Sequence, residues 1–241
     1  MCTLTWWRED DRYGVLFNRD ESVKRGRAEP PAVFTDKPCR SIRPVDPDGG
    51  GTWIWVNEAG MIACVLNKYT EISHIPAHPV SRGVLLTSLV PAASTAALEQ
   101  RMRETDCSPY RGFYLFCCDG VSEILLSWDG GGLSKRAADE LYCPLTTSGF
   151  QPDQVVAYRT QQYRLLVAES QGGRRRSLEA YHTAHNPDFP AHSVLMARSD
   201  ARTVSHSRIV VDRRRISFSY AAVDTEQRLE PWVVTTLERE P

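Results

Sequence analysis

Short β-prone runs that come in pairs around turn residues restrict the possible folds of this chain more than any other feature. The first pair spans residues 3–7 and 14–18 and flanks a polar turn at residues 9–12. Two more pairs are predicted at these positions: 52–56 with 61–66, and 112–118 with 123–128. Paired runs of this length around polar turns are typical of β-hairpins. The chain is therefore predicted to contain sheets that are mostly antiparallel.

Helices are predicted between these hairpins. Pro91 divides the first helical stretch into residues 81–90 and 92–103, because a proline inside a helix removes a backbone donor. The remaining predicted elements are helices at 154–170 and 174–185 and strands at 193–198, 203–211 and 215–220. Residues 29–51 are rich in Pro, Gly and Asp and are predicted to form a long surface loop. Hairpins with helices inserted between them favour a layered α+β fold over a doubly wound parallel sheet.

Composition and charge exclude several classes of protein. Apolar residues make up 41% of the chain and charged residues 24%, which is typical of a globular protein and not of a disordered one. The net charge of −1 supplies no overall field that would attract nucleic acid or an anionic membrane. No stretch approaches the roughly 20 apolar residues that span a bilayer, and the N-terminal residues lack the regions of a secretory signal. We therefore expect a cytoplasmic protein without a membrane span, folded as one domain over residues 1–241, that does not bind nucleic acid.

The seven cysteines are an odd number with no C-x-x-C spacing, which argues against a disulfide framework and a zinc ribbon. Cys2 differs from the others because it directly follows the initiator Met1. Its side chain is small enough to allow removal of Met1, which would leave a free α-amine beside the thiol. The α-amine has a pKa of roughly 7.7–8.0 and the thiol about 8.5, so a proton can pass between them near neutral pH. One residue would then supply both nucleophile and general base.

The first hairpin brings polar residues to Cys2. If paired positions sum to about 21, Cys2 lies opposite Arg19; if they sum to about 22, it lies opposite Asp20. A shift of one residue moves every side chain to the other face of the sheet, and both registers stay open at this point. In either register Arg19 can stabilise a thiolate, while Asp20 or Glu21 can bind the α-ammonium. The second hairpin places Asn67 near glycines 49–51, where its amide can donate to an oxyanion.

Taken together, these motifs resemble a known family. They are Met1-Cys2-Thr3, Asn18-Arg19-Asp20-Glu21, the block from Gly50 to Gly60, and Leu66-Asn67. They are similar to the motifs of the NRDE family, which includes the transport-and-Golgi-organisation protein 2 group. Residues 200–208 are also similar to bacterial members, although the resemblance is dense only over residues 1–67.

The NRDE family in turn resembles the cysteine N-terminal-nucleophile hydrolases of the choloylglycine hydrolase and penicillin V acylase type. This resemblance implies a four-layer αββα sandwich and the cleavage of a non-peptide amide bond in a small-molecule substrate. It also implies these roles: Cys2 as nucleophile, Arg19 as the arginine beside it, Asp20 (and less closely Glu21) as the amine-binding carboxylate, Asn67 as the oxyanion donor, and Arg208 as a late arginine.

One position departs from the hydrolase pattern, because Thr147 stands where those enzymes carry a second asparagine of the site. Two hypotheses follow. In the first, the protein is an amide hydrolase that uses Cys2 and its own α-amine and needs no metal or organic cofactor. In the second, it is a non-catalytic binding or trafficking protein for haem or an acyl-lipid-type ligand. A retained Met1 would favour the second hypothesis, because it removes the α-amine from Cys2.

Simpler interpretations accompany these hypotheses. Cys2 can follow Met1 by chance, and Arg19 and Asp20 can form an ion pair of little energetic value at the end of a hairpin. His182 and His185 are three residues apart on a predicted helix and could ligate a metal, although solvated histidines are more common. The helices show no long heptad seam, so the pattern does not indicate an oligomeric state.

Overall fold

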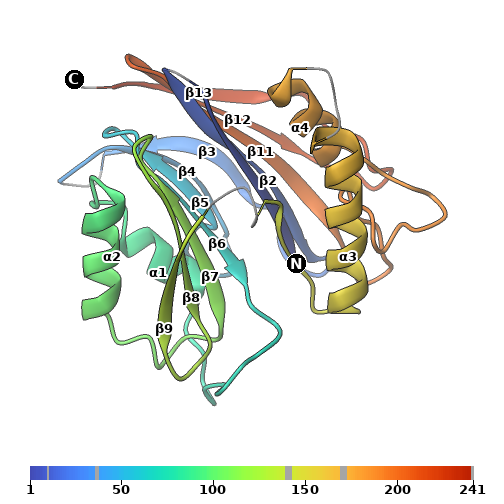
Figure 1. Ribbon diagram of the computed structural model, residues 1–241, viewed down its shortest axis with the longest axis horizontal. Helices are drawn as coiled ribbons and strands as arrows, with labels where there is room; N and C mark the ends of the chain where they lie inside the picture. The colour runs from blue at the N-terminus through green and yellow to red at the C-terminus, as the bar shows by residue number, and fades with distance from the viewer. Residues whose placement is uncertain (10, 36–37, 139–142, 169–172, 240–241) are drawn as a thin grey trace.

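Two antiparallel sheets pack face to face, and helices cover the outer face of each sheet (Figure 1). The computed structural model describes residues 1–9, 11–35, 38–138, 143–168 and 173–239. Its layers follow the order helices, sheet, sheet, helices, and the pairings within both sheets are antiparallel. The predicted α+β class and four-layer αββα sandwich are therefore confirmed. Within the described ranges no helix is long and apolar enough to cross a membrane.

The six-stranded sheet contains both the N-terminal and the C-terminal strands of the chain. In spatial order it consists of β10 (Leu145–Thr147), β1 (Cys2–Glu9), β2 (Arg12–Ser22), β11 (Ala201–Val211), β12 (Arg215–Ala222) and β13 (Val233–Glu238). Its outer face is covered by α3 (Pro152–Tyr163), which continues into a π-helical turn (Arg164–Ala168), and by α4 (Arg174–His182). The N-terminus thus lies in the interior of this sheet's order, between β10 and β2.

The seven-stranded sheet follows the order of the chain. It consists of β3 (Glu29–Phe34), β4 (Ser41–Val45), β5 (Ile54–Asn57), β6 (Ile62–Asn67), β7 (Phe113–Cys118), β8 (Glu123–Trp128) and β9 (Leu133–Ala137). Helices α1 (Arg82–Ser88) and α2 (Thr95–Glu104) cover its outer face. Ser94 caps α2 by accepting a hydrogen bond from the Ala97 amide, which satisfies one of the free N–H groups at the helix start.

The register of β1 and β2 decides which side chains enter the core. Cys2 pairs with Arg19, and Leu4 pairs with Phe17, so the first of the two predicted registers is confirmed. Side chains alternate between the faces of a strand. Trp6, which lies on the same face as Leu4, packs against Phe116 of the opposite sheet with ring centroids 4.7 Å apart. The other face of β1 points toward the helices.

Several predicted elements differ from the structure. Residues 29–51 contain β3 and β4 instead of only a loop, because the prolines of β3 lie in an edge strand, where a missing N–H is tolerated. Residues 193–198 do not form a strand, and the Leu195 amide donates instead to the carbonyl of Ala184 at 2.9 Å. Strands β9, β10 and β13 were not predicted. Five residues of predicted elements lie outside the described residues: Asp10, Asp36, Lys37, Glu169 and Ser170.

A buried polar cluster joins β1, β2, β11 and α4. The Asn18 amide donates to the carbonyls of His182 at 2.8 Å and Val194 at 3.1 Å. Its Oδ1 is therefore left to accept from Nδ1 of His182 at 3.0 Å and of His206 at 2.7 Å. Both rings carry their proton on Nδ1 in this arrangement, and the Thr5 hydroxyl donates to Nε2 of His182 at 2.8 Å. The two rings stack with centroids 5.3 Å apart.

Both histidines of this cluster are neutral. Burial, followed by the positive charge of Arg208, lowers the pKa of His206 to about 3. Burial also lowers the pKa of His182 well below its ordinary value, and the neighbouring His206 and Arg159 add to this shift. A proton on either ring would place a charge in the interior with no carboxylate among the hydrogen-bond partners of the cluster.

We expect the free energy of unfolding to decrease as the pH falls below about 6.5. The unfolded chain protonates His206 near pH 6.5, whereas the folded protein does so only at about pH 3. The unfolded state therefore binds more protons between these values, and stability is lost by up to about 1.4 kcal/mol per pH unit and histidine. Urea unfolding across this range would measure the slope. His206→Gln is expected to lower stability near neutral pH but to reduce the slope, whereas His78→Gln, at an exposed position, should leave the slope unchanged. An equal slope in wild type and His206→Gln would contradict the assignment.

Candidate active site

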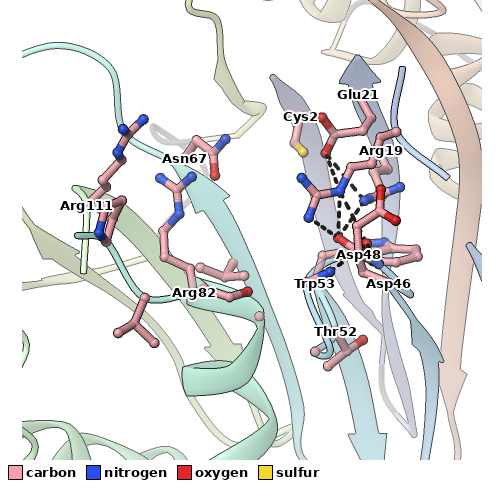
Figure 2. Close-up of a pocket in the computed structure, with 18 of the residues that line it drawn as sticks. Cys2, Arg19, Glu21, Asp46, Asp48, Thr52, Trp53, Asn67, Arg82 and Arg111 are labelled. Carbon is pink, nitrogen blue, oxygen red and sulfur yellow. Dashed lines mark hydrogen bonds and ion pairs between the residues drawn. The ribbon is translucent and has the colours of Figure 1, made fainter. Parts of the chain in front are cut away.

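A cavity of about 430 Å³ lies between the two sheets beside the N-terminus, a size typical of small-molecule sites (Figure 2). Both sheets and the loops between their strands contribute side chains to it. Its lining residues include Cys2, Arg19, Asp20, Glu21, Asp46, Asp48, Trp53, Val65, Asn67, Arg82 and Arg111. The structure thus brings four of the five predicted site residues, Cys2, Arg19, Asp20 and Asn67, to one cavity.

Cys2 is the first residue of β1 and is only 9% exposed. In the sheet it lies between Arg19 of β2 and Thr147 of β10. Burial raises the pKa of its thiol, and the charge of Asp20 acts in the same direction. The terminal ammonium of Met1 and the Arg19 guanidinium act in the opposite direction. With Met1 in place the net effect is upward, so the thiol is protonated at neutral pH.

Met1 fills the space next to Cys2 that removal of this methionine would empty. Its ammonium donates to the Tyr69 hydroxyl at 3.1 Å and to the Asp20 carbonyl at 3.4 Å. Its sulfur accepts a hydrogen bond from the Ser148 hydroxyl at 2.7 Å. Burial alone would lower the pKa of this ammonium, but its interactions with Cys2, Tyr69 and Asp20 outweigh it and raise the pKa. The surroundings of the terminus therefore favour a positively charged amine.

Arg19 reaches the cavity beside Cys2 and is held there by carboxylates. Its Nη2 lies 3.1 Å from Asp46 Oδ2 and 3.3 Å from Glu21 Oε2. The guanidinium also stacks on the Trp53 ring at 4.3 Å from the centroid. Burial would raise the pKa of Asp46, but the hydrogen bond from Arg25 and the charge of Arg19 outweigh it and lower the pKa. Asp46 was not predicted, and its position in a Pro- and Gly-rich turn gave no signal of this role.

The Asp20 side chain lies on the other face of β2 from Arg19, because successive residues of a strand alternate. It is fully buried, and its Oδ2 accepts from Arg159 of α3 at 3.0 Å. Its Oδ1 accepts from the Thr203 hydroxyl at 2.7 Å. With Met1 present, the Asp20 backbone carbonyl, not the carboxylate, contacts the ammonium. Arg159 was not predicted, because only the tertiary fold brings α3 against this strand.

Asn67 is the last residue of β6 and lies across the cavity from Cys2 (Figure 2). Its side-chain amide donates to the Tyr69 hydroxyl at 2.8 Å. The same hydroxyl accepts from the Met1 ammonium. Tyr69 therefore links the predicted oxyanion donor to the chain terminus, and sequence reasoning missed it.

Arg208 does not lie at this site. On β11 it pairs with Leu16 of β2, which pairs in turn with Thr5 of β1. These three residues lie three positions along their strands from the neighbouring positions of Cys2 and Arg19. Their side chains therefore point to the opposite face of the sheet. Accordingly, Arg208 forms an ion pair with Glu179 of α4 and does not line the cavity. The resemblance implied that Arg208 lies at the site, but the alternation of side chains along β11 places it on the face that the helices cover.

Thr147, where the hydrolase pattern has an asparagine, directly neighbours Cys2 across the β1–β10 pairing. Its hydroxyl is buried and has no hydrogen-bond partner among the described residues. Buried polar groups are usually hydrogen-bonded, so this unpaired hydroxyl is notable. The position thus has a hydroxyl where an amide was expected.

Metal binding finds no support in the described part of the chain, where no three His, Cys, Asp or Glu side chains are grouped so that they could hold an ion. The predicted pair His182 and His185 does not form a site. His182 belongs to the buried cluster with Asn18, and Nδ1 of His185 bonds the Leu195 carbonyl at 2.8 Å.

Comparison with known proteins identifies both family and fold. Two solved structures from Clostridium perfringens are similar to this chain. The first is the C2A mutant of a conjugated bile acid hydrolase, which is 14% identical with a TM-score of 0.52 and covers 98% of this chain and 96% of its own. The second is an arginine-to-leucine variant of a conjugated bile acid hydrolase, which is 14% identical with a TM-score of 0.51 and covers 99% of this chain and 97% of its own. They show that the fold is that of the N-terminal-nucleophile hydrolases. No curated protein sequence matches. The family model described as "Transport and Golgi organisation 2" matches residues 1–212, so the chain belongs to this family, as its motifs predicted.

Proposed function

We propose that this protein is a cysteine N-terminal-nucleophile hydrolase that cleaves a carboxamide bond in a small molecule, with Cys2 as nucleophile after removal of Met1. One observation carries the proposal: Cys2, Arg19 and Asn67 line the same cavity, and Cys2 directly follows Met1 in the sequence. The similar solved structures support it, because they are conjugated bile acid hydrolases and one of them replaces its own second-position cysteine.

The first half-reaction forms a thioester. The free α-amine of Cys2 takes the thiol proton, and the thiolate attacks the carbonyl carbon of the substrate. The Asn67 amide donates to the oxyanion of the tetrahedral intermediate. The C–N bond then breaks, the α-ammonium gives its proton to the leaving amine, and the acyl group stays on Cys2. Arg19 favours the thiolate throughout, since its guanidinium is fixed by Asp46 and Glu21.

The second half-reaction consumes one water molecule. The α-amine accepts a proton from the water, and the resulting hydroxide attacks the thioester carbon. Breakage of the C–S bond releases the carboxylic acid and returns the thiol. The net reaction is the hydrolysis of an amide to an acid and an amine, so no redox partner is required.

A second candidate function is binding or trafficking of haem or an acyl-lipid-type ligand without catalysis. Two observations favour it: Thr147 replaces the second amide beside Cys2, and the Met1 ammonium donates to the Tyr69 hydroxyl in its present position. A protein that kept Met1 would have no base at Cys2. Retention of Met1, together with saturable binding of haem or acyl-CoA that depends on cavity residues, would support this alternative.

The state of Met1 and the acylation of Cys2 give a direct test. The intact mass of the purified protein is expected to lack one methionine residue. Acid quenching during turnover of an acyl-amide library is expected to trap a thioester on Cys2. Cys2→Ala should lose both adduct and turnover, by several orders of magnitude in rate. Cys39→Ala changes a cysteine that does not line the cavity and should retain both. Absence of adduct and turnover in protein that lacks Met1 would reject the hydrolase.

The reactivity of Cys2 tests the role assigned to Arg19. Arg19→Gln removes the neighbouring positive charge, and the rate of Cys2 alkylation by iodoacetamide near neutral pH is expected to fall roughly tenfold. Asp46→Asn, which loosens Arg19, should give a smaller decrease. Arg27→Gln is the matched control, because Arg27 is exposed and does not line the cavity. Peptide mass spectrometry would follow the alkylation, and equal rates in all variants would show that Arg19 does not act on the thiol.

A further inference from the structure

Two arginines line the cavity on the side opposite Cys2 and Arg19. Figure 2 shows Arg82 and Arg111 with Asn67 on one wall, whereas Cys2 and Arg19 lie on the other with the acidic residues. Nothing in the proposed reaction uses these two arginines. Their position within the cavity nevertheless makes them available to a bound molecule.

The backbone holds the two arginines on the same wall although they are far apart in the chain. Val80 and Tyr110 form a parallel bridge, in which the Val80 amide donates to the Pro109 carbonyl at 2.9 Å. The Arg82 guanidinium then donates through Nη1 to the carbonyl of Gly112 at 2.9 Å. Arg82 is therefore tied to the segment that carries Arg111, and the backbone brings the two residues to the same wall.

The charges on the two walls are balanced in different ways. Arg19 and Arg25, on the Cys2 side, share the carboxylate of Asp46. Neither Arg82 nor Arg111 has an ion pair with any residue in the described ranges. Burial, together with the like charge of Arg111, lowers the pKa of Arg82. Arg82 is desolvated and Arg111 is exposed beside it. Neighbouring guanidiniums without a counter-ion are stabilised when an anion binds between them.

The opposite wall makes an anion bind in one orientation. Glu21 and Asp46 line the cavity on the Cys2 side and repel a negative group there. A ligand with one acidic group would therefore direct it toward Arg82 and Arg111 and leave its uncharged part near Cys2. Val65 and Trp53 add apolar surface to the cavity, and Trp53 lies on the Arg19 side.

We propose that Arg82 and Arg111 form an anion subsite that binds an acidic group (carboxylate or phosphate) of the substrate and thereby presents the amide bond to Cys2. The subsite deepens the proposed function and rests on it for its role in catalysis. Binding of an acidic ligand does not depend on turnover, so it can be measured separately.

Binding is measured in Cys2→Ala protein, which cannot turn over an amide. The probes are N-octanoyl-β-alanine, its neutral carboxamide, and N-octanoyl-aminoethyl phosphate, which share one acyl chain and differ in the terminal group. Calorimetry is expected to show at least about tenfold tighter binding of an acidic probe than of the neutral one. Comparison of the carboxylate and phosphate probes identifies which anion the subsite prefers.

The variant with Arg82→Gln and Arg111→Gln is expected to lose this preference while its affinity for the neutral probe stays the same. Arg111→Gln alone changes an exposed side chain, so it tests the subsite even if the double variant does not fold. Arg101→Gln, at an exposed position of α2 outside the cavity lining, is the control. Equal affinity for acidic and neutral probes, or a preference that survives in the double variant, overturns the proposal.

Protein with Cys2 intact separates the two proposals. Arginine-dependent preference for an acidic probe, without a thioester on Cys2, would support the subsite and reject the hydrolase. A thioester on Cys2 that forms equally well from acidic and neutral amides would support the hydrolase and reject the subsite.

Discussion

The pairing of β1 with β2 is the constraint on which the rest of the structure depends. Because Cys2 pairs with Arg19, the two side chains share the face that points into the cavity. The alternate residues, among them Thr5 and Asp20, face the helices and bond to His182 and Arg159. A shift by one residue would exchange the two faces, place polar residues between the sheets and separate Arg19 from the thiol. Sheet packing and the chemistry of the terminus thus require the same register.

Apolar matching could indicate this register from the sequence, since it pairs Leu4 with Phe17 and Trp6 with Val15. It could not decide between the alternatives, because a turn centred near residues 10–12 is compatible with either register. Local motifs were sufficient for Cys2, Arg19 and Asn67, which lie in or beside hairpins. Asp46, Arg82, Arg111 and Arg159 come from segments that only the tertiary fold brings together. Arg208 shows the reverse error: a position in the chain was transferred without the strand alternation that decides its face.

Met1 connects the fold to the choice between catalysis and binding. Its ammonium contacts Tyr69 and the Asp20 backbone, groups that suit a charged amine at the end of β1. Once Met1 is removed, the new amine belongs to the residue that carries the thiol. Burial, which raises the pKa of the thiol, is then opposed by a charge on the same residue as well as by Arg19. In the proposed reaction, the thiol is therefore protonated and unreactive while Met1 is present, and it becomes the nucleophile once Met1 is removed.

The separation of charge within the cavity explains how one site can both activate a thiol and orient a ligand. Arg19 has carboxylate partners, so its charge is fixed in place and is largely unavailable to a ligand. Arg82 and Arg111 have no such partners within the part of the chain that the structure describes, so they remain the stronger attraction for an anion. If all four cavity arginines were equally free, an acidic substrate could bind beside Cys2 and block it. In the proposed subsite, pairing on one wall and its absence among the described residues of the other direct the acid away from Cys2, because Asp46 and Glu21 lie on the Cys2 side.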